Sequence, residues 1–325
     1  MKDFVGVRDV ISSEQLMELS EKSNGPALVR LSSHWGAILI NGYLMTVYAG
    51  TVWCIPLFML QGVLINFLYA PEHECDHYTA FKTRWINTWV ARICGFLIIF
   101  NSEYHRGTHY YHHRHTQDWD EDPEIAARDR LDSVRAYLVA LSGIKNIWTG
   151  RIVIMARHTF GFVDETFLSD NQKRKIVSTA RWYSAGYSII FLTGIGMQSW
   201  WPIYLWLGPF VAMRWVYWLQ GLGEHFGLTH EDNTLLNTRT IKTNAFMRWV
   251  NWNMAYHTAH HTFPSVPFHR LPELHREIED RLGYPLPSES YFKLHWGYIK
   301  DLYRGRSEMD ICDTYTREMR QLGRL

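Results

Sequence analysis

The stretch from Leu31 to Pro71 reads LSSHWGAILINGYLMTVYAGTVWCIPLFMLQGVLINFLYAP and contains no Lys, Arg, Asp or Glu. One pass through the hydrocarbon core of a bilayer needs about 20 apolar residues, and this block is about twice that long. The small residues at Ala49-Gly50 divide it near its middle. The block therefore predicts a membrane hairpin with helices at roughly 34–49 and 52–70. A buried hairpin of a soluble protein is the alternative, but such helices normally keep a polar face.

A second block without charged residues runs from Trp182 to Met213 and is interrupted at Gly196–Pro202. It is somewhat short for two membrane passes unless its second helix continues past Arg214 to about Gln220. With that extension, it predicts a second membrane hairpin at about 182–220.

The distribution of positive charge predicts the orientation of these hairpins. Lys and Arg accumulate on the cytoplasmic side of membrane helices. The turns near Gly50 and Ser199 carry none, whereas residues 91–181 and the C-terminal third carry many. Both termini and the middle segment are therefore expected on the cytoplasmic side. The predicted fold is an all-α membrane protein with four transmembrane helices in two hairpins and a cytoplasmic helical cap.

Composition excludes several other classes of protein. The 325 residues carry a net charge of +1, so no nucleic-acid partner is indicated. The four cysteines show no CxxC pair, which favours a reducing compartment, and the polar N-terminus is no signal peptide. We expect a cytoplasmic N-terminal segment at 1–33, a main domain at 34–275 and a cytoplasmic helical C-terminal segment at 276–325.

Three histidine clusters carry the chemistry. HECDH, HYYHH and HTAHH each place imidazoles three or four residues apart, a spacing that aims them from one face of a helix. Eight imidazoles exceed the four ligands of one tetrahedral zinc and suit two metal ions with open positions. Nitrogen-rich sites with open positions fit iron and oxygen chemistry. The eight residues are His73, His77, His109, His112, His113, His257, His260 and His261.

HxxxH, HxxHH and HxxHH in this order, between and after two membrane hairpins, resemble the membrane-bound fatty-acid desaturase and hydroxylase superfamily. The flanking segments RGTHYYHHRHT followed by DEDPE, EHFG, and NMAYHTAHHTFPSVPFHRLPELH are similar to bacterial-type members. The resemblance runs from about Ala70 to His275 and includes the hairpins. It implies a non-haem di-iron centre that uses dioxygen and two external electrons.

The resemblance also implies a ninth histidine ligand after the last membrane helix. His225 in EHFG matches this position best, and His230 is its rival. Two further histidines of the second cluster, His105 and His115, do not occupy ligand positions of the pattern. No catalytic side chain is expected beyond the metal ligands.

A metal-bound imidazole usually donates its other N–H to a carboxylate or carbonyl oxygen. The candidate acceptors are Glu74, Asp76, Asp118, Asp122 and Glu224. Arg106 could pair with one of these acids or with an acidic group of a substrate or lipid, and Asn253 could hold a metal-bound water. The alternative interpretation of these acidic residues is that they are simply solvated at the cytoplasmic face.

The resemblance implies a desaturase that introduces a double bond into a fatty acyl chain or related lipid. The same class supports hydroxylases and ketolases, and some relatives act on small amino-acid-derived molecules. Electrons would come from a separate ferredoxin or cytochrome b5 type protein with its reductase, because the chain carries no HPGG, ferredoxin-like cysteine set or GxGxxG. More distant alternatives are a membrane zinc hydrolase, a bis-histidine haem carrier and a non-enzymatic metal-binding membrane protein.

Overall fold

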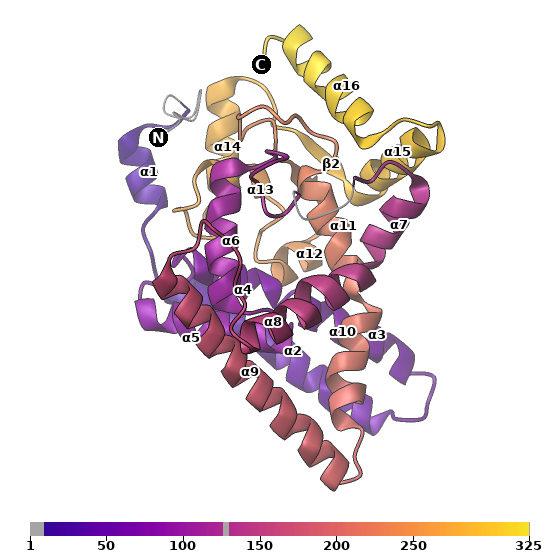
Figure 1. Cartoon of the computed structure of the whole chain (residues 1–325). Helices are drawn as coiled ribbons and strands as arrows, with labels where there is room; N and C mark the ends of the chain where they lie inside the picture. The colour runs from indigo at the N-terminus through magenta and orange to yellow at the C-terminus, as the bar shows by residue number, and fades with distance from the viewer. Residues whose placement is uncertain (1–9, 126–129, 325) are drawn as a thin grey trace. The chain divides into compact units, whose positions relative to one another are not determined.

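The computed structural model describes residues 10–125 and 130–324, which are mostly helical (Figure 1). The chain divides into two compact units. Unit 1 contains the chain up to Lys22, Thr108–Leu141 and the chain from Trp218 onward, and unit 2 contains Ser23–Gly107 and Ser142–Tyr217. Each unit thus combines segments that lie far apart in the sequence.

Unit 2 contains the first expected hairpin region and the second as far as Tyr217. Its first hairpin turns at Gly50, whose φ of +76° is a conformation that glycine adopts without steric cost. The helices on either side of this turn, α2 and α3, pack against each other. The elements that lie wholly in unit 2 are α2 (Gly25–Val47), α3 (Cys54–Asn66), α4 (Tyr69–Asp76), α5 (Arg84–Leu97), η1 (Asn146–Val153), α8 (Ile154–Thr159), α9 (Asp170–Gly196), η2 (Ile203–Leu207) and α10 (Gly208–Ala212).

Close backbone approach holds α3 against α10. A Cβ on Gly62 would overlap the carbonyl oxygen of Pro209 and would lie 2.6 Å from Cγ of Met213. One turn further along α3, the Asn66 side chain donates to the Phe210 carbonyl at 2.8 Å. The glycine therefore brings two helices close enough for a side chain of one to bond the backbone of the other.

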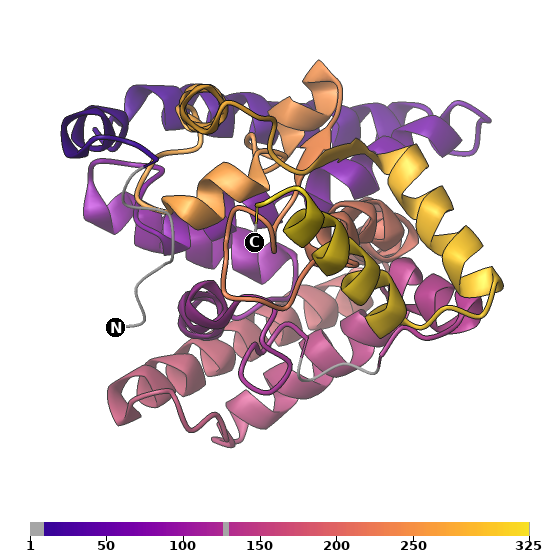
Figure 2. The ribbon, with the colours of Figure 1, turned by 90° about the horizontal axis from the view of Figure 1, so that it is seen from above.

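Unit 1 combines short helices with one small parallel sheet, in which Thr240–Lys242 (β1) pairs with Ser288–Ser290 (β2). Figure 2 shows its C-terminal helices, α15 and α16 in yellow, joined by a short loop. Its core is formed by Leu131, Tyr137, Leu222, Phe226, Ile241, Ala255, Leu294, Tyr298, Leu302 and Ile311. The helices wholly in unit 1 are α1 (Ser13–Leu19), α12 (Ala245–Val250), α13 (His257–Thr262), α14 (Leu271–Leu282), α15 (Tyr291–Tyr303) and α16 (Glu308–Gln321).

Three further helices each contain a boundary between the units. They are α6 (Ser102–His115), α7 (Val134–Ser142) and α11 (Arg214–His225). In α6 the boundary follows Gly107, so that His105 belongs to unit 2 and the cluster from His109 to His113 belongs to unit 1.

The expectation of a helical fold is confirmed, with the parallel strand pair as an addition. Each strand has only three residues, too few for an alternating pattern to reveal it in the sequence. Within the described residues, one helix, Cys54–Asp76, is long and apolar enough to cross a membrane, and a bent pair covering 134–142 and 146–159 raises this number to two. Four spans are therefore not confirmed.

Candidate metal centre

Seven buried or half-buried histidines of unit 1 come from three helices. The second half of α6 carries His109, His112 and His113, and α13 carries His257, His260 and His261. The last residue of α11 is His225. As the sequence spacing predicts, the i, i+3 and i+4 positions of α6 and of α13 point three imidazoles in a common direction.

The ring nitrogens of these histidines form two groups. The first group is His109, His113 and His260, and the second is His112, His225 and His261. In each group, one ring nitrogen of every histidine lies within 4.8 Å of those of the others. The second group is accompanied by His257, whose Nε2 atom lies 2.8 Å from Nε2 of His225.

The separations between these nitrogens match those of ligands on a shared metal ion. Two nitrogens bound at 2.0–2.1 Å and at right angles to each other are about 3.0 Å apart. The Nε2 atom of His113 lies 2.9 Å from that of His109 and 3.2 Å from that of His260. The donor set, imidazole nitrogen throughout, suits zinc, copper, iron or nickel.

One buried imidazole nitrogen adds to this fit. Nε2 of His261 has no hydrogen-bond partner in the described part of the chain, whereas its Nδ1 lies 3.2 Å from Oγ1 of Thr116. A buried polar atom without a partner is costly, and a metal ion is one of the few groups that would satisfy it. The residues present therefore fit a bound metal.

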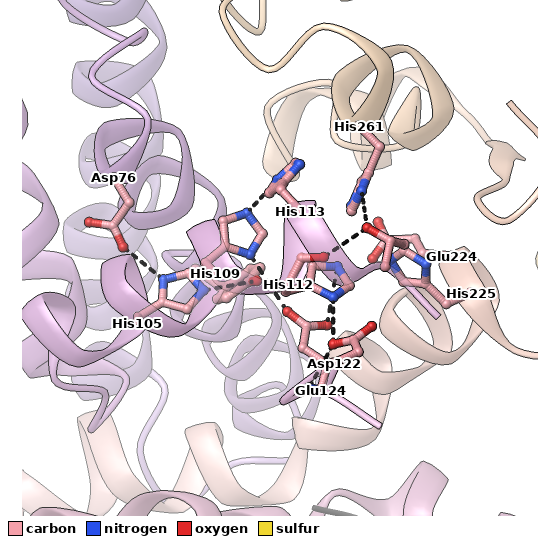
Figure 3. Close-up of polar contacts among 12 residues, drawn as sticks. Asp76, His105, His109, His112, His113, Asp122, Glu124, Glu224, His225 and His261 are labelled. Atoms are coloured by element: carbon pink, nitrogen blue, oxygen red, sulfur yellow. Dashed lines mark hydrogen bonds and ion pairs between the residues drawn. The ribbon is translucent and has the colours of Figure 1, made fainter. Parts of the chain in front are cut away.

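Carboxylates lie near the other nitrogens of three of these histidines, two of which, His109 and His112, are labelled in Figure 3. Nδ1 of His112 lies 2.8 Å from Oδ1 of Asp122. Nδ1 of His257 lies 3.4 Å from Oε1 of Glu224, and Nδ1 of His109 lies 3.6 Å from Oε1 of Glu124. Of the three contacts, that of His112 is a hydrogen bond, which is how proteins orient metal-bound imidazoles and raise their basicity.

The protonation states of these buried histidines differ. Burial, followed by the charge of His112, lowers the pKa of His225 and of His260 to about 3, so both imidazoles are neutral at physiological pH. Burial would also lower the pKa of His112, but the carboxylates of Asp122 and Glu124 outweigh it and raise that pKa to about 9. Because the neutral imidazole is the form that binds a metal, His225 and His260 are already in that form, whereas His112 must first release a proton.

His225 and His230, the two rivals for the further histidine position, differ in their contacts. Both ring nitrogens of His230 are engaged by protein groups, because Nε2 accepts from the indole of Trp119 at 3.0 Å and Nδ1 donates to the Gln117 carbonyl at 2.7 Å. His225, in contrast, presents its Nε2 to His257. Of these two histidines, His225 is the one that joins the second nitrogen group.

The remaining predicted residues of unit 1 have other contacts. The Asp118 carboxylate accepts the backbone N–H groups of Asp120 at 3.0 Å and Glu121 at 3.3 Å, which makes it a turn cap. The Asn253 amide donates to the Phe268 carbonyl at 3.0 Å. His115 stacks on Tyr111 with ring centroids 4.3 Å apart.

Unit 2 holds the first histidine cluster at the end of the apolar helix Cys54–Asp76. One ring nitrogen of His73 and one of His77 lie within 4.8 Å of each other, and their ring centroids are 5.1 Å apart. The Glu74 carboxylate, predicted to hold a histidine, accepts from the hydroxyl of Thr79 at 2.6 Å.

A second, separate cluster in unit 2 surrounds His105. Its Nδ1 lies 2.8 Å from Glu72 and 2.9 Å from Asp76 (Figure 3 shows the latter contact). Asp76 also pairs with Arg106 at 3.2 Å, as expected for that arginine. Burial would lower the pKa of His105, but the charge of Glu72 and the hydrogen bond to Asp76 raise it to about 9.

Sequence reasoning missed Glu72, Thr116 and Glu124 as partners of histidines. Glu124 lies in the DEDPE segment already noted for its resemblance, which was the available signal. Glu72 is one residue before His73, and Thr116 follows α6 directly, and neither has a spacing that distinguishes it from an ordinary helix residue.

Comparison with known proteins identifies relatives of the chain. The model of the family described as "Fatty acid desaturase" matches residues 27–292. An sn-1 oleoyl-lipid 12-desaturase from Anabaena variabilis is 21% identical over 273 residues, which cover 74% of this chain and 73% of that protein. A fatty acid conjugase from Calendula officinalis is 24% identical over 283 residues, which cover 74% of this chain and 72% of that protein.

Another sn-1 oleoyl-lipid 12-desaturase, from Picosynechococcus sp., matches a shorter part of the chain. It is 22% identical over 240 residues, and these cover 71% of this chain. The matched part spans only 57% of the length of that relative.

Proposed function

The chain belongs to the fatty acid desaturase family, and from this premise we propose that it is a membrane oxidoreductase that introduces a double bond into a fatty acyl chain with dioxygen at a pair of histidine-bound iron ions. The expected family is confirmed by the match over residues 27–292. The observation that carries the proposal is the convergence of seven histidines in unit 1 into two nitrogen-rich groups.

The proposed ligands are the histidines of the three clusters together with His225. In unit 1, the first group would hold one ion and the second group, with His257, would hold the other. His73 and His77 of unit 2 are proposed as ligands on the family pattern. Two ions are favoured over one because the two nitrogen groups in unit 1 already offer more donors than one tetrahedral site accepts.

Bound iron would supply the dioxygen chemistry that no side chain provides, namely removal of hydrogen from two adjacent unactivated carbons. The protein's own residues bind and orient. Asp122 hydrogen-bonds Nδ1 of His112, which fixes the direction of the Nε2 atom of that ring, and Glu224 lies 3.4 Å from Nδ1 of His257. The burial of His260 and His261 excludes water from the groups that would contact the ions.

The membrane topology of four helices in two hairpins, with cytoplasmic termini, is part of the proposal. It is supported by the turn at Gly50, by the break between α9 and η2, and by exposed apolar side chains on α2 and α9. The proposed boundaries remain 1–33, 34–275 and 276–325. A lipid-linked acyl substrate is favoured by the printed activities of the cyanobacterial relatives. The electron donor would be a ferredoxin or cytochrome b5 type protein with its reductase.

The first test is metal content and absorption of the detergent-purified protein, followed by product analysis. We expect about two irons per chain, no haem band, and unsaturated acyl products in lipids from expressing cells. One zinc per chain would support the hydrolase alternative instead, and a haem Soret band would support the electron carrier.

A single-residue test compares two histidines, one inside a nitrogen group and one outside both groups. His260→Ala removes one member of the first nitrogen group, and we expect it to lose at least one iron per chain. His115→Ala is the control, because His115 lies outside both nitrogen groups, and it should retain full iron. A folded His260→Ala variant with full iron and normal turnover would remove His260 from the site.

A further inference from the structure

A basic hollow lies on unit 2 beside the first half of α9. It has a volume of about 790 Å³ and is lined by Gly161, Asp170, Lys173, Arg174, Val177, Ser178, Arg181 and Trp182. The α9 residues among them recur every three or four positions, so they form one stripe along the helix. The hollow is therefore a continuous surface feature rather than a chance gathering of side chains.

The charges of this stripe are not neutralised within the described part of the chain. Lys173, Arg174 and Arg181 contribute three positive charges against the one negative charge of Asp170. None of the three forms an ion pair with a described carboxylate, and the Nε atom of Arg181 donates to the Thr159 carbonyl at 3.1 Å. Three such side chains in one hollow favour a ligand with a phosphate group.

The second half of the same helix is apolar and exposed. Trp182 follows the last arginine of the stripe and is 77% exposed, and Ile189, Leu192 and Ile195 beyond it are each at least 66% exposed. The length from Trp182 to Gly196 is about 21 Å at 1.5 Å per residue, a large part of a hydrocarbon core. The aromatic residue thus separates a basic half from an apolar half, as tryptophan does at membrane interfaces.

Two more aromatic side chains flank the hollow. Phe160 and Phe162, on either side of the lining residue Gly161, are 76% and 60% exposed. Exposed phenylalanines beside cationic side chains suit a ligand that joins an anionic group to acyl chains. A hydrophilic acidic protein would offer these two phenylalanines no apolar group to contact.

We infer that this hollow binds the phosphate-bearing headgroup of an anionic phospholipid, with Lys173, Arg174 and Arg181 on the phosphate and Trp182 at the level of the acyl ester groups. The inference rests on the proposed entry of α9 into the membrane at Trp182. It does not depend on the metal chemistry, because none of the lining residues is a proposed ligand.

The test measures binding of short-chain dioctanoyl phosphatidylglycerol to the full chain in neutral detergent by native mass spectrometry, with dioctanoyl phosphatidylcholine as the zwitterionic comparison. Each Lys or Arg near an anionic lipid surface contributes about fivefold in affinity. We expect the triple variant Lys173→Gln, Arg174→Gln, Arg181→Gln to bind phosphatidylglycerol at least tenfold more weakly and to leave the weak binding of phosphatidylcholine unchanged.

The matched control changes the same number of charges on exposed residues of unit 1, Lys293→Gln, Lys300→Gln and Arg304→Gln, and should bind phosphatidylglycerol as the unmodified chain does. Equal binding by the triple variant and the unmodified chain would overturn the inference. So would displacement of the phospholipid by an equal concentration of inorganic phosphate, or loss of binding to an acidic ferredoxin in the triple variant while phosphatidylglycerol still binds. Iron content measured on the same preparations separates failure of this site from failure of the proposed function.

Discussion

Asp122 is the residue that most closely connects sequence to chemistry at the scale of single side chains. Its Oδ1 accepts from His112 at 2.8 Å and from the Glu124 backbone N–H at 2.9 Å, and its Oδ2 accepts from the Gln117 N–H at 2.9 Å. Burial opposes its ionised form, but the charge of His112 outweighs that effect and lowers the pKa of Asp122. The carboxylate therefore stays ionised while it orients a proposed ligand.

We predict that Asp122→Asn weakens metal binding by about 10- to 100-fold. An amide has only one acceptor oxygen, so in either orientation its NH₂ group faces an N–H donor that the carboxylate had satisfied. The measurement is competition for iron with a chelator of known affinity. Asp120→Asn, an exposed change in the same loop, is the control and should keep the original affinity. Equal affinities of the two variants would show that Asp122 does not support the site.

Arg214 illustrates a buried charge that is held by neutral groups. Its side chain is fully buried, donates to Asn66 and Asn146 at 3.1 Å each, and lies 4.0 Å from the ring centre of Tyr217. The arginine thus connects α3, η1 and α11 within unit 2, so that its charge faces protein groups.

We predict that Arg214→Met destabilises the protein, because each of the two amide oxygens left without a donor costs about 1–3 kcal/mol. The melting temperature in detergent should fall by about 5 °C or more. Arg304→Met, at an exposed position after α15, is the matched control and should melt within a degree or two of the unmodified chain. An unchanged melting temperature for Arg214→Met would mean that these hydrogen bonds contribute no net stability.

At the scale of secondary-structure elements, the packing of α3 on α10 depends on a glycine, Gly62, which has no side chain. A Cβ on Gly62 would overlap the Pro209 carbonyl oxygen, which is backbone and cannot rotate away. Gly36, on α2, has no atom within 4 Å of a Cβ placed on it. The two glycines therefore test the same substitution with and without a steric cost.

We predict that Gly62→Ala sharply lowers the yield of folded protein, because α3 and α10 must separate to admit the methyl group. Gly36→Ala should be neutral or should stabilise the protein by up to about 1 kcal/mol, since alanine is the better helix former. Size-exclusion profiles and melting curves of the two variants give the answer. Equal folded yields would contradict the close approach of these helices.

The same scale shows which elements a sequence can predict. The hairpin turn at Gly50 and the break after Gly196 were predicted correctly, because small residues and loss of apolar periodicity are local signals. The placement of His109, His112 and His113 on one face of a helix was also predicted correctly, from the 3.6-residue period of an α-helix. The π-helical segments η1 and η2 were not predicted, because the wider hydrogen-bond spacing follows from packing and has no local sequence mark.

At the scale of the whole molecule, a bound metal would connect helices that are distant in the sequence. The two nitrogen groups of unit 1 take their members from α6, α11 and α13. Because an unfolded chain does not hold these nitrogens together, metal binding would stabilise the folded state. The size of that effect is set by the free metal concentration relative to the dissociation constant.

We predict that removing the metal with a chelator lowers the melting temperature, by an amount equivalent to about 2.7 kcal/mol when free metal had been at 100 times its dissociation constant. Readdition of ferrous iron should restore the original value. A His112→Ala variant should melt with little response to either treatment, since it lacks a member of the second nitrogen group. A fully demetallated protein that melts as the loaded one does would contradict a metal ion shared among these helices.

The sequence by itself determined the class of the fold, the family and the residues that converge in unit 1. These follow from local patterns: a block without charges, a turn at Gly50, and histidines spaced by one helical turn. It also pointed to Asp122, which hydrogen-bonds His112, and to Glu224, which lies 3.4 Å from His257. Such features can be recognised from the sequence alone, because residues three or four positions apart share a helix face whatever the helix packs against.

Only the tertiary structure decided which partner each polar side chain takes. Asp76 contacts His105 and Arg106, Asp118 caps a turn, and Asn253 bonds a backbone carbonyl, and the order of residues in the chain specifies none of these contacts. Thr116, in turn, reaches His261 across 145 positions of sequence. A hydrogen bond requires a donor and an acceptor about 3 Å apart, and for residues on different helices that distance is set by how the helices pack, not by their order in the chain.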